Sequence, residues 1–153
     1  MGRLTTHVLD AAHGCPGSSI KVELYRVEGQ QLELVNTALT NSDGRVDAPL
    51  LQGDDYRTGV YQLQFSAGAY YRARGVQLPD TAFLDVVVLR FGIDEQQEHY
   101  HVPLLISPYS YSTYRGSELV ARRIFVGPWP ALTLAGFFSS GVFGLMSSDQ
   151  SLD

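Results

Sequence analysis

Cysteine and lysine are nearly missing from this 153-residue chain, in which each occurs once, as Cys15 and Lys21. A lone cysteine excludes an intramolecular disulfide and a cysteine-rich metal site, and small secreted domains usually carry more cysteines. The net charge of −5 argues against a nucleic-acid partner, because such proteins carry a basic patch. No apolar segment of signal-peptide length occurs near the start, so we expect a cytoplasmic protein.

Charge is missing altogether from one long stretch, since no charged side chain occurs between Ile124 and Ser148. The composition shifts just after Ser117. This shift predicts one domain over residues 1–117 and an apolar C-terminal extension over residues 118–153.

Three interpretations of the extension stay open. The first is an accidental addition that is disordered or loosely packed, the second is a membrane anchor, and the third is a segment packed on the domain surface. As a helix, the uncharged stretch is long enough to cross a bilayer, which favours the anchor. Pro128, Pro130 and several glycines weaken a helix there, which argues against the anchor.

What the chain does have is a hydrophobic fraction of 44% and a dominant sequence period of two. Apolar and polar residues alternate over 20–25 and 61–65, as in half-buried strands. Residues 84–91 are almost continuously apolar, so we expect that strand to be buried on both faces. Turn signals separate these runs, and only residues 66–75 look helical. The pattern predicts an all-β fold, a β-sandwich with one short helix.

Two of the four histidines lie two residues apart in the segment EHYHVPLL. On a strand, His99 and His101 would share a face, opposite to Tyr100 and Val102. Three interpretations fit this spacing: two surface imidazoles, two ligands of a zinc ion completed by further side chains, and a catalytic general base. The spacing alone does not choose among them.

Three other polar residues are ambiguous when each is taken alone. His7 lies in an expected N-terminal strand, where Thr5, His7 and Leu9 share a face. Arg45 follows an Asp-Gly turn, and Ser117 follows a glycine without the Gly-x-Ser-x-Gly elbow of many serine hydrolases. Taken singly, they are better explained as a packed histidine, a solvated arginine and a turn serine.

The combination of motifs is more specific. The segments LTTHVLDAAHGCPG, TNSDGRVDAPLL, FLDVVVLRFGI and HYHVPLLISPYSYSTYRGS follow one another in this order between residues 4 and 117. In these segments the chain resembles the transthyretin-like family, and within it the 5-hydroxyisourate hydrolases. The closing Tyr-Arg-Gly-Ser distinguishes those hydrolases from the hormone-carrying transthyretins.

The resemblance implies a transthyretin-like two-sheet β-sandwich that dimerises by edge pairing and forms a homotetramer, with active sites in the cleft between dimers. It implies hydrolysis of 5-hydroxyisourate, a step of urate breakdown, with neither cofactor nor metal. The catalytic set falls on His7, Arg45, His101 and Ser117. Arg45, Tyr114 and Ser117 would bind the substrate, and His99 would have a supporting role.

In the implied reaction a water molecule opens the six-membered ring of the substrate. His101 is the expected general base, His7 shares the proton transfer or holds the water, and Arg45 stabilises developing negative charge. Two alternatives come from other classes of protein. One is a transthyretin-like module that binds a small ligand without chemistry, and the other is a structural zinc protein using His99 and His101.

Overall fold

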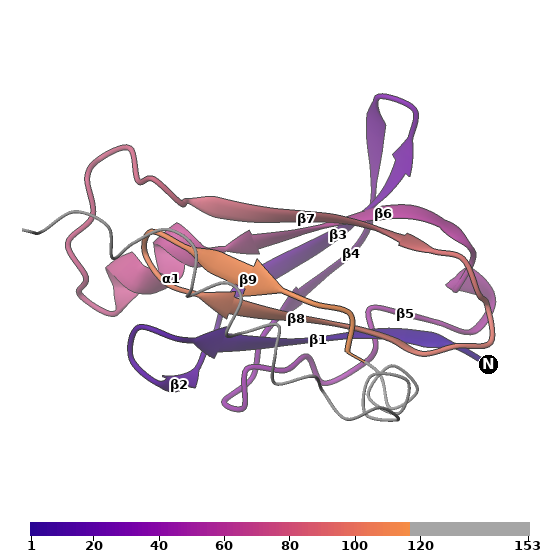
Figure 1. Ribbon diagram of the computed structural model, residues 1–153, viewed down its shortest axis with the longest axis horizontal. Coiled ribbons are helices and arrows are strands. Elements are labelled where there is room, and N and C mark those ends of the chain that lie inside the picture. The colour runs from indigo at the N-terminus through magenta and orange to yellow at the C-terminus, as the bar shows by residue number, and fades with distance from the viewer. Residues whose placement is uncertain (117–153) are drawn as a thin grey trace, which may run out of the picture. The chain divides into compact units, whose positions relative to one another are not determined.

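The computed structural model describes residues 1–116, which form two β-sheets stacked face to face (Figure 1). In the first sheet the strand order is β2-β1-β8-β9, and β5 also pairs with β1. The pair β1–β8 is parallel, and the other pairs are antiparallel. The bounds of these strands are Arg3–Asp10 (β1), Cys15–Pro16 (β2), Leu51–Gln52 (β5), Tyr100–Ile106 (β8) and Tyr111–Thr113 (β9).

The second sheet has the order β4-β3-β6-β7, and all its pairs are antiparallel. A short 3₁₀ turn, η1, precedes β6, and the helix α1 follows it at one end of the sandwich (Figure 1). The bounds are Lys21–Glu28 (β3), Gln31–Leu39 (β4), Gly53–Asp55 (η1), Gly59–Ser66 (β6), Ala67–Ala73 (α1) and Val86–Ile93 (β7). The expected two-sheet β-sandwich with one short helix is confirmed.

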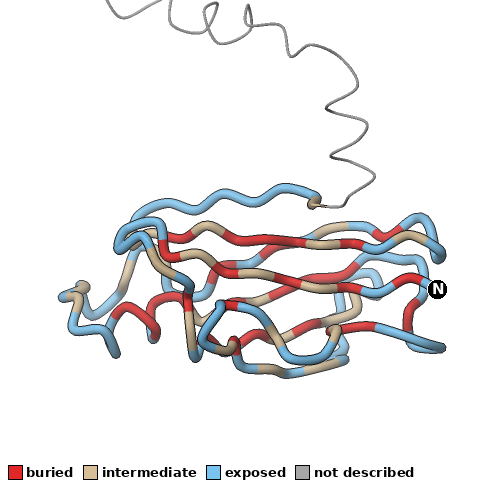
Figure 2. Tube along the Cα trace, turned by 90° about the horizontal axis from the view of Figure 1, so that it is seen from below, coloured by how far each residue is buried: buried red, intermediate tan, exposed pale blue. Residues whose placement is uncertain are grey.

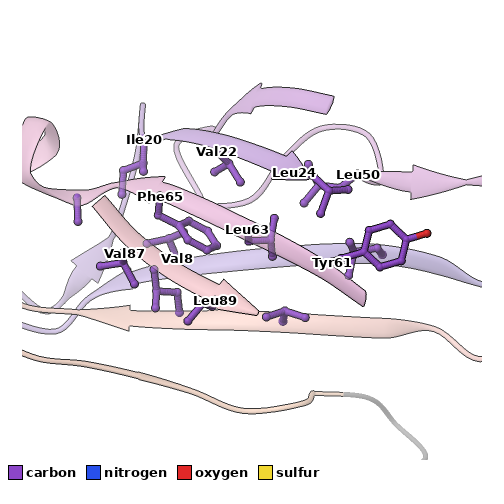
Figure 3. Packing of buried hydrophobic residues seen from close by; sticks show 14 of the residues in the cluster. Val8, Ile20, Val22, Leu24, Leu50, Tyr61, Leu63, Phe65, Val87 and Leu89 are labelled. Atoms are coloured by element: carbon purple, nitrogen blue, oxygen red, sulfur yellow. The ribbon is translucent and has the colours of Figure 1, made fainter. Parts of the chain in front are cut away.

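The core lies between the two sheets and is built by the period-two pattern. Buried positions alternate with more exposed ones along β1 and β7, and buried segments run along the strands while most turns are exposed (Figure 2). Side chains from both sheets fill the space between them (Figure 3). Full burial of each large apolar side chain contributes roughly 1.5–3 kcal/mol. They include Val8, Val22, Leu24, Leu63, Phe65, Val87 and Leu89.

The expectation that residues 84–91 are buried on both faces is wrong for this chain. In β7, Val87 and Leu89 are buried, whereas Val86 and Val88 are 47% and 42% exposed. The reason is that the described fold has two sheets, so the other sheet covers only one face of β7. The outward valines therefore form an apolar strip on the surface of the single chain.

A buried carboxylate ties the end of β1 to the helix. The side chain of Asp10 is fully buried and accepts hydrogen bonds from the hydroxyl groups of Tyr70 and Tyr71, both at 2.8 Å. It also accepts from the backbone N–H groups of Ala12 and His13, and its Oδ2 lies 2.6 Å from His13 Nδ1. Burial alone would raise the pKa of Asp10, but these hydrogen bonds outweigh burial, and the net effect lowers the pKa.

Within residues 1–116, no helix is long and apolar enough to cross a membrane. The extension over residues 118–153, on which the membrane-anchor interpretation depends, lies outside the described residues, as does Ser117.

Candidate active site

The predicted site residues of β1 and β8 lie on the outer face of the first sheet. In β1, Leu4, Thr6 and Val8 point into the core, so Thr5 and His7 between them point outward. In β8, Tyr100 and Val102 are buried, and His101 between them is only partly buried. The parallel register places Thr5 beside His101. Two segments that are distant in sequence therefore share one surface.

His101 is held by a hydrogen bond and surrounded by positive charge. Its Nδ1 lies 2.8 Å from the hydroxyl oxygen of Thr5. Partial burial lowers the pKa of His101 below its ordinary 6.5, and the Arg45 guanidinium and the His7 imidazole nearby lower it further. These effects favour the neutral form of His101, which is the form that can accept a proton.

Arg45 is presented by a tight turn that packs on β1. The side-chain oxygen of Asn41 accepts hydrogen bonds from the backbone N–H groups of Asp43 (2.9 Å) and Arg45 (3.1 Å). Gly44 has a φ of +76°, and a side chain there would collide with the Val8 carbonyl oxygen, so the turn requires glycine. The Gly44 carbonyl accepts from Val8 N–H at 2.8 Å. The exposed Arg45 is thereby placed next to β1.

His7 contacts the same turn through its side chain. Its Nε2 lies 2.9 Å from the carbonyl oxygen of Asp43, and the backbone of His7 forms an antiparallel bridge with Arg45. A carbonyl oxygen can only accept, so the His7 Nε2 carries a proton and donates it to this hydrogen bond. Nδ1 is then the only nitrogen of His7 that can accept a proton. The two histidines of the face therefore have different hydrogen-bond partners, a backbone carbonyl for His7 and a hydroxyl group for His101.

The chain returns to His101 at the end of the described residues. The backbone groups of Gly116 and His101 exchange two hydrogen bonds, with N–O distances of 3.0 and 2.7 Å. A Cβ atom at position 116 would lie only 3.0 Å from Cδ2 of the His101 ring. Gly116 of the closing motif is therefore held directly beside His101.

Arg115 holds the backbone next to the Gly116–His101 bridge in place. Its guanidinium lies 3.9 Å from the ring centroid of Tyr100 and donates to the carboxylate of Glu98 at 2.5 Å. The Tyr100 hydroxyl in turn donates to the carboxylate of Asp94 at 2.5 Å. These contacts join the segment before β8 to the segment after β9, and they hold the backbone on both sides of the Gly116–His101 bridge.

The other described residues predicted for the site, Tyr114 and His99, form no hydrogen bond with the His101 side chain, whose partner is Thr5. Tyr114 is exposed, lies beside Gly116, and lines a cavity of about 390 Å³ between the edges of β7 and β9. Tyr100 and Val102 also line this cavity, and they point away from the face that carries His101, so the cavity is separate from that face. His99 is exposed and lies one residue before β8.

The part of the chain that the structure describes contains no cluster of side chains that fits the metal interpretation. Within residues 1–116, no three His, Cys, Asp or Glu side chains come close enough together to hold a metal ion.

Sequence reasoning missed three residues that organise the face: Thr5, Asn41 and Gly116. A signal for Thr5 was present, since it shares the outward face of its strand with His7. Its contact with His101 could not be read, because the two residues are 96 positions apart.

Comparison with known proteins agrees with the motifs. The family model described as HIUase/Transthyretin matches residues 4–116, which is most of the chain. The chain belongs to this family. Its expected resemblance is thereby confirmed.

Several known proteins are similar to this chain in sequence and in fold. A 5-hydroxyisourate hydrolase of Pseudomonas aeruginosa is 79% identical over 117 residues, covering 76% of this chain and 93% of the relative. The solved 5-hydroxyisourate hydrolase of Klebsiella pneumoniae is 34% identical with a TM-score of 0.63, covering 76% of this chain and all of that one. An (S)-allantoin synthase structure is 44% identical with a TM-score of 0.72, covering 76% of this chain and 44% of that one.

Proposed function

We propose that the domain is a 5-hydroxyisourate hydrolase that opens the substrate ring with a water molecule activated by His101. The observation that carries the proposal is that His101 lies near the Arg45 guanidinium and His7 on the outer face of one sheet. His101 has a lowered pKa because of burial and the nearby Arg45 and His7. Relatives that bear this activity in their names support the substrate.

His101 acts as the general base. Its Nδ1 contacts Thr5, which leaves Nε2 to take a proton from water. The water oxygen bonds to the substrate carbonyl carbon, and the ring C–N bond then breaks. The leaving nitrogen takes up the proton that His101 accepted, so the enzyme returns to its starting state. General-base assistance of this kind contributes roughly 10²–10⁴-fold.

Arg45 stabilises the negative charge that develops on the carbonyl oxygen as the carbon becomes tetrahedral. Its planar, permanently charged guanidinium matches the oxygens of a urate-like ring. The same charge disfavours the imidazolium form of His101. Arg45 therefore both binds substrate and keeps the base ready.

His7 has a different part from His101. Because its Nε2 donates to the Asp43 carbonyl, His7 is held against the turn that presents Arg45. Only its Nδ1 is left to hold the water or to share the proton transfer. This asymmetry makes His101 the principal base.

The other site residues complete the proposal. Ser117 orients substrate or water by a hydrogen bond, Tyr114 contacts the substrate from its place beside Gly116, and His99 has a supporting role just before the start of β8. The chemistry needs neither a cofactor nor a metal ion, since a histidine base and an arginine supply both required effects.

The proposed assembly is a homotetramer of the cytoplasm, in which dimers pair through sheet edges and the active faces meet across a cleft. Two observations support an assembly: β7 is an edge strand with one unpaired side in the described chain, and its outward residues Val86 and Val88 are apolar and exposed. The single cysteine supports a reducing compartment. Light scattering tests the assembly: a mass four times that of the chain is expected, and a fully active monomer would contradict it.

The function is tested by following the absorbance of freshly generated 5-hydroxyisourate with the full chain, without added metal. We expect decay far faster than the spontaneous rate, unaffected by a chelator. Equal decay with and without protein would overturn the proposal, and saturable binding without turnover would identify a ligand-binding protein. Activity that is lost on chelation and restored by zinc would instead identify a metal enzyme.

A further inference from the structure

In the described part of the chain, the Thr5 side chain forms a hydrogen bond with the His101 ring. The register of the two strands sets this contact. The two residues are paired across the parallel strands β1 and β8, and both point to the outer face. The hydroxyl oxygen lies 2.8 Å from Nδ1. Paired neighbours on both sides, at Leu4–Tyr100 and Thr6–Val102, fix this separation.

We propose that Thr5 is a positioning residue that selects the tautomer of His101, by accepting a hydrogen bond from Nδ1–H so that Nε2 is left unprotonated. The role in catalysis rests on the proposed function, whereas the tautomer does not. A hydroxyl oxygen can accept while its own proton points elsewhere, and Thr5 is half-buried, so that proton can reach solvent.

The direction of this hydrogen bond follows from the proton cycle. If Thr5 donated to Nδ1, the proton of neutral His101 would sit on Nε2, and Nε2 could not act as a base. When His101 takes a proton from water, both nitrogens become donors, so Thr5 must then accept. Accepting in both states lets the base load and unload its proton without any rotation of the ring.

A neutral acceptor also suits the charges around the ring. A carboxylate in place of Thr5 would orient His101 equally well but would favour the imidazolium form. The groups around His101 that bear on its charge, Arg45 and His7, both disfavour that form. Thr5 thus orients the ring without opposing them.

The test compares three variants of the full chain: Thr5→Val, Thr5→Ser and Thr6→Val. Valine keeps the β-branched shape without the hydroxyl, and serine keeps the hydroxyl. Thr6 is the matched control, because it is the next residue of the strand and makes a hydrogen bond of similar length, 2.7 Å, to the Val102 carbonyl in the core. The readouts are kcat, KM, and ¹⁵N NMR of the His101 ring, which reports which nitrogen carries the proton.

We expect Thr5→Val to lower kcat about 10-fold with little change in KM, as for loss of one hydrogen bond, and to populate the Nε2–H tautomer. Thr5→Ser should retain both kcat and the Nδ1–H tautomer. Thr6→Val should reduce stability and leave the tautomer unchanged.

An unchanged tautomer and kcat in Thr5→Val, or Nε2–H in the unaltered protein, would overturn the assignment. Absence of any turnover in the unaltered protein would overturn the proposed function instead, and the NMR readout would still decide the role of Thr5.

Discussion

Gly116 and His101 form a two-way backbone bridge in which the glycine lies directly against the imidazole ring. The two N–O distances of the bridge are 2.7 and 3.0 Å. A Cβ atom added at position 116 would lie 3.0 Å from His101 Cδ2. The closing motif therefore needs a glycine here for a steric reason, because a side chain would crowd the His101 ring.

Replacing this glycine should disturb catalysis without unfolding the domain. In Gly116→Ala the new methyl group forces the His101 ring to move by a few tenths of an ångström, and we expect kcat/KM to fall roughly 10-fold because catalysis depends on placement. Gly92→Ala is the control, since its Cβ would meet nothing within 4 Å. Equal activity of both variants would show that the His101 ring tolerates a methyl group at position 116.

Removing the base or the cation should cost much more. We expect His101→Ala and Arg45→Ala each to lower kcat/KM by at least ~10²-fold, because one removes proton transfer and the other removes charge stabilisation. Arg90→Ala, which loses only hydrogen bonds to Gln62 in the second sheet, should stay close to the unaltered enzyme. Steady-state kinetics checks all three, and full activity in His101→Ala and Arg45→Ala would refute the site.

The pH dependence should move in a definite direction. Arg45 lowers the pKa of His101, so Arg45→Gln should raise that pKa toward 6.5. The acid limb of kcat/KM, which reports protonation of the base, then shifts to higher pH. Arg45→Lys keeps the charge and should leave the limb near its original position. NMR titration of His101 gives the same quantity directly, and a pKa that stays put or falls in Arg45→Gln would contradict the electrostatic account.

Asp10 should stabilise the fold at neutral pH and lose this effect at strongly acidic pH. Asp10→Asn replaces an acceptor of charged hydrogen bonds by a group that cannot accept them all, and we expect a loss of about 2–3 kcal/mol in the free energy of unfolding at pH 7. The folded pKa lies below the ordinary 3.8. The stabilisation is thus complete above that value and disappears as the pH falls through the folded pKa.

Urea unfolding at pH 7 and below pH 3.8 measures this difference between Asp10→Asn and the unaltered protein. The exposed Asp55 provides the control substitution, Asp55→Asn, which should change stability little at either pH. A gap between Asp10→Asn and the unaltered chain that is the same at both values would argue against a titrating carboxylate.

The extension after Ser117 should be dispensable. Residues 1–116 build a two-sheet core of their own, so a chain ending at Ser117 is expected to fold and to be at least as active as the full chain. Sedimentation of both proteins with and without membranes checks the anchor interpretation, which gains only if the full chain alone sediments with them. A shortened chain that failed to fold would show that residues 118–153 belong to the core.

Local sequence patterns determined much of this protein. Period-two alternation predicted the strands around Val22 and Leu63, and the Asn-Ser-Asp-Gly segment predicted the turn before Arg45. The motifs identified the family and pointed to His7, Arg45 and His101. These features depend on neighbouring residues, because side-chain alternation and turn geometry are set over a few positions of the chain.

Tertiary structure alone decided which strands are neighbours. The parallel pairing of β1 with β8 brings Thr5 to His101, and folding places Tyr70 and Tyr71 on the buried Asp10. It also places β7 in a two-layer sandwich, where the other sheet covers only one face of its apolar run. Strand order follows from burying two sheets against each other across long loops, so no short stretch of sequence contains it.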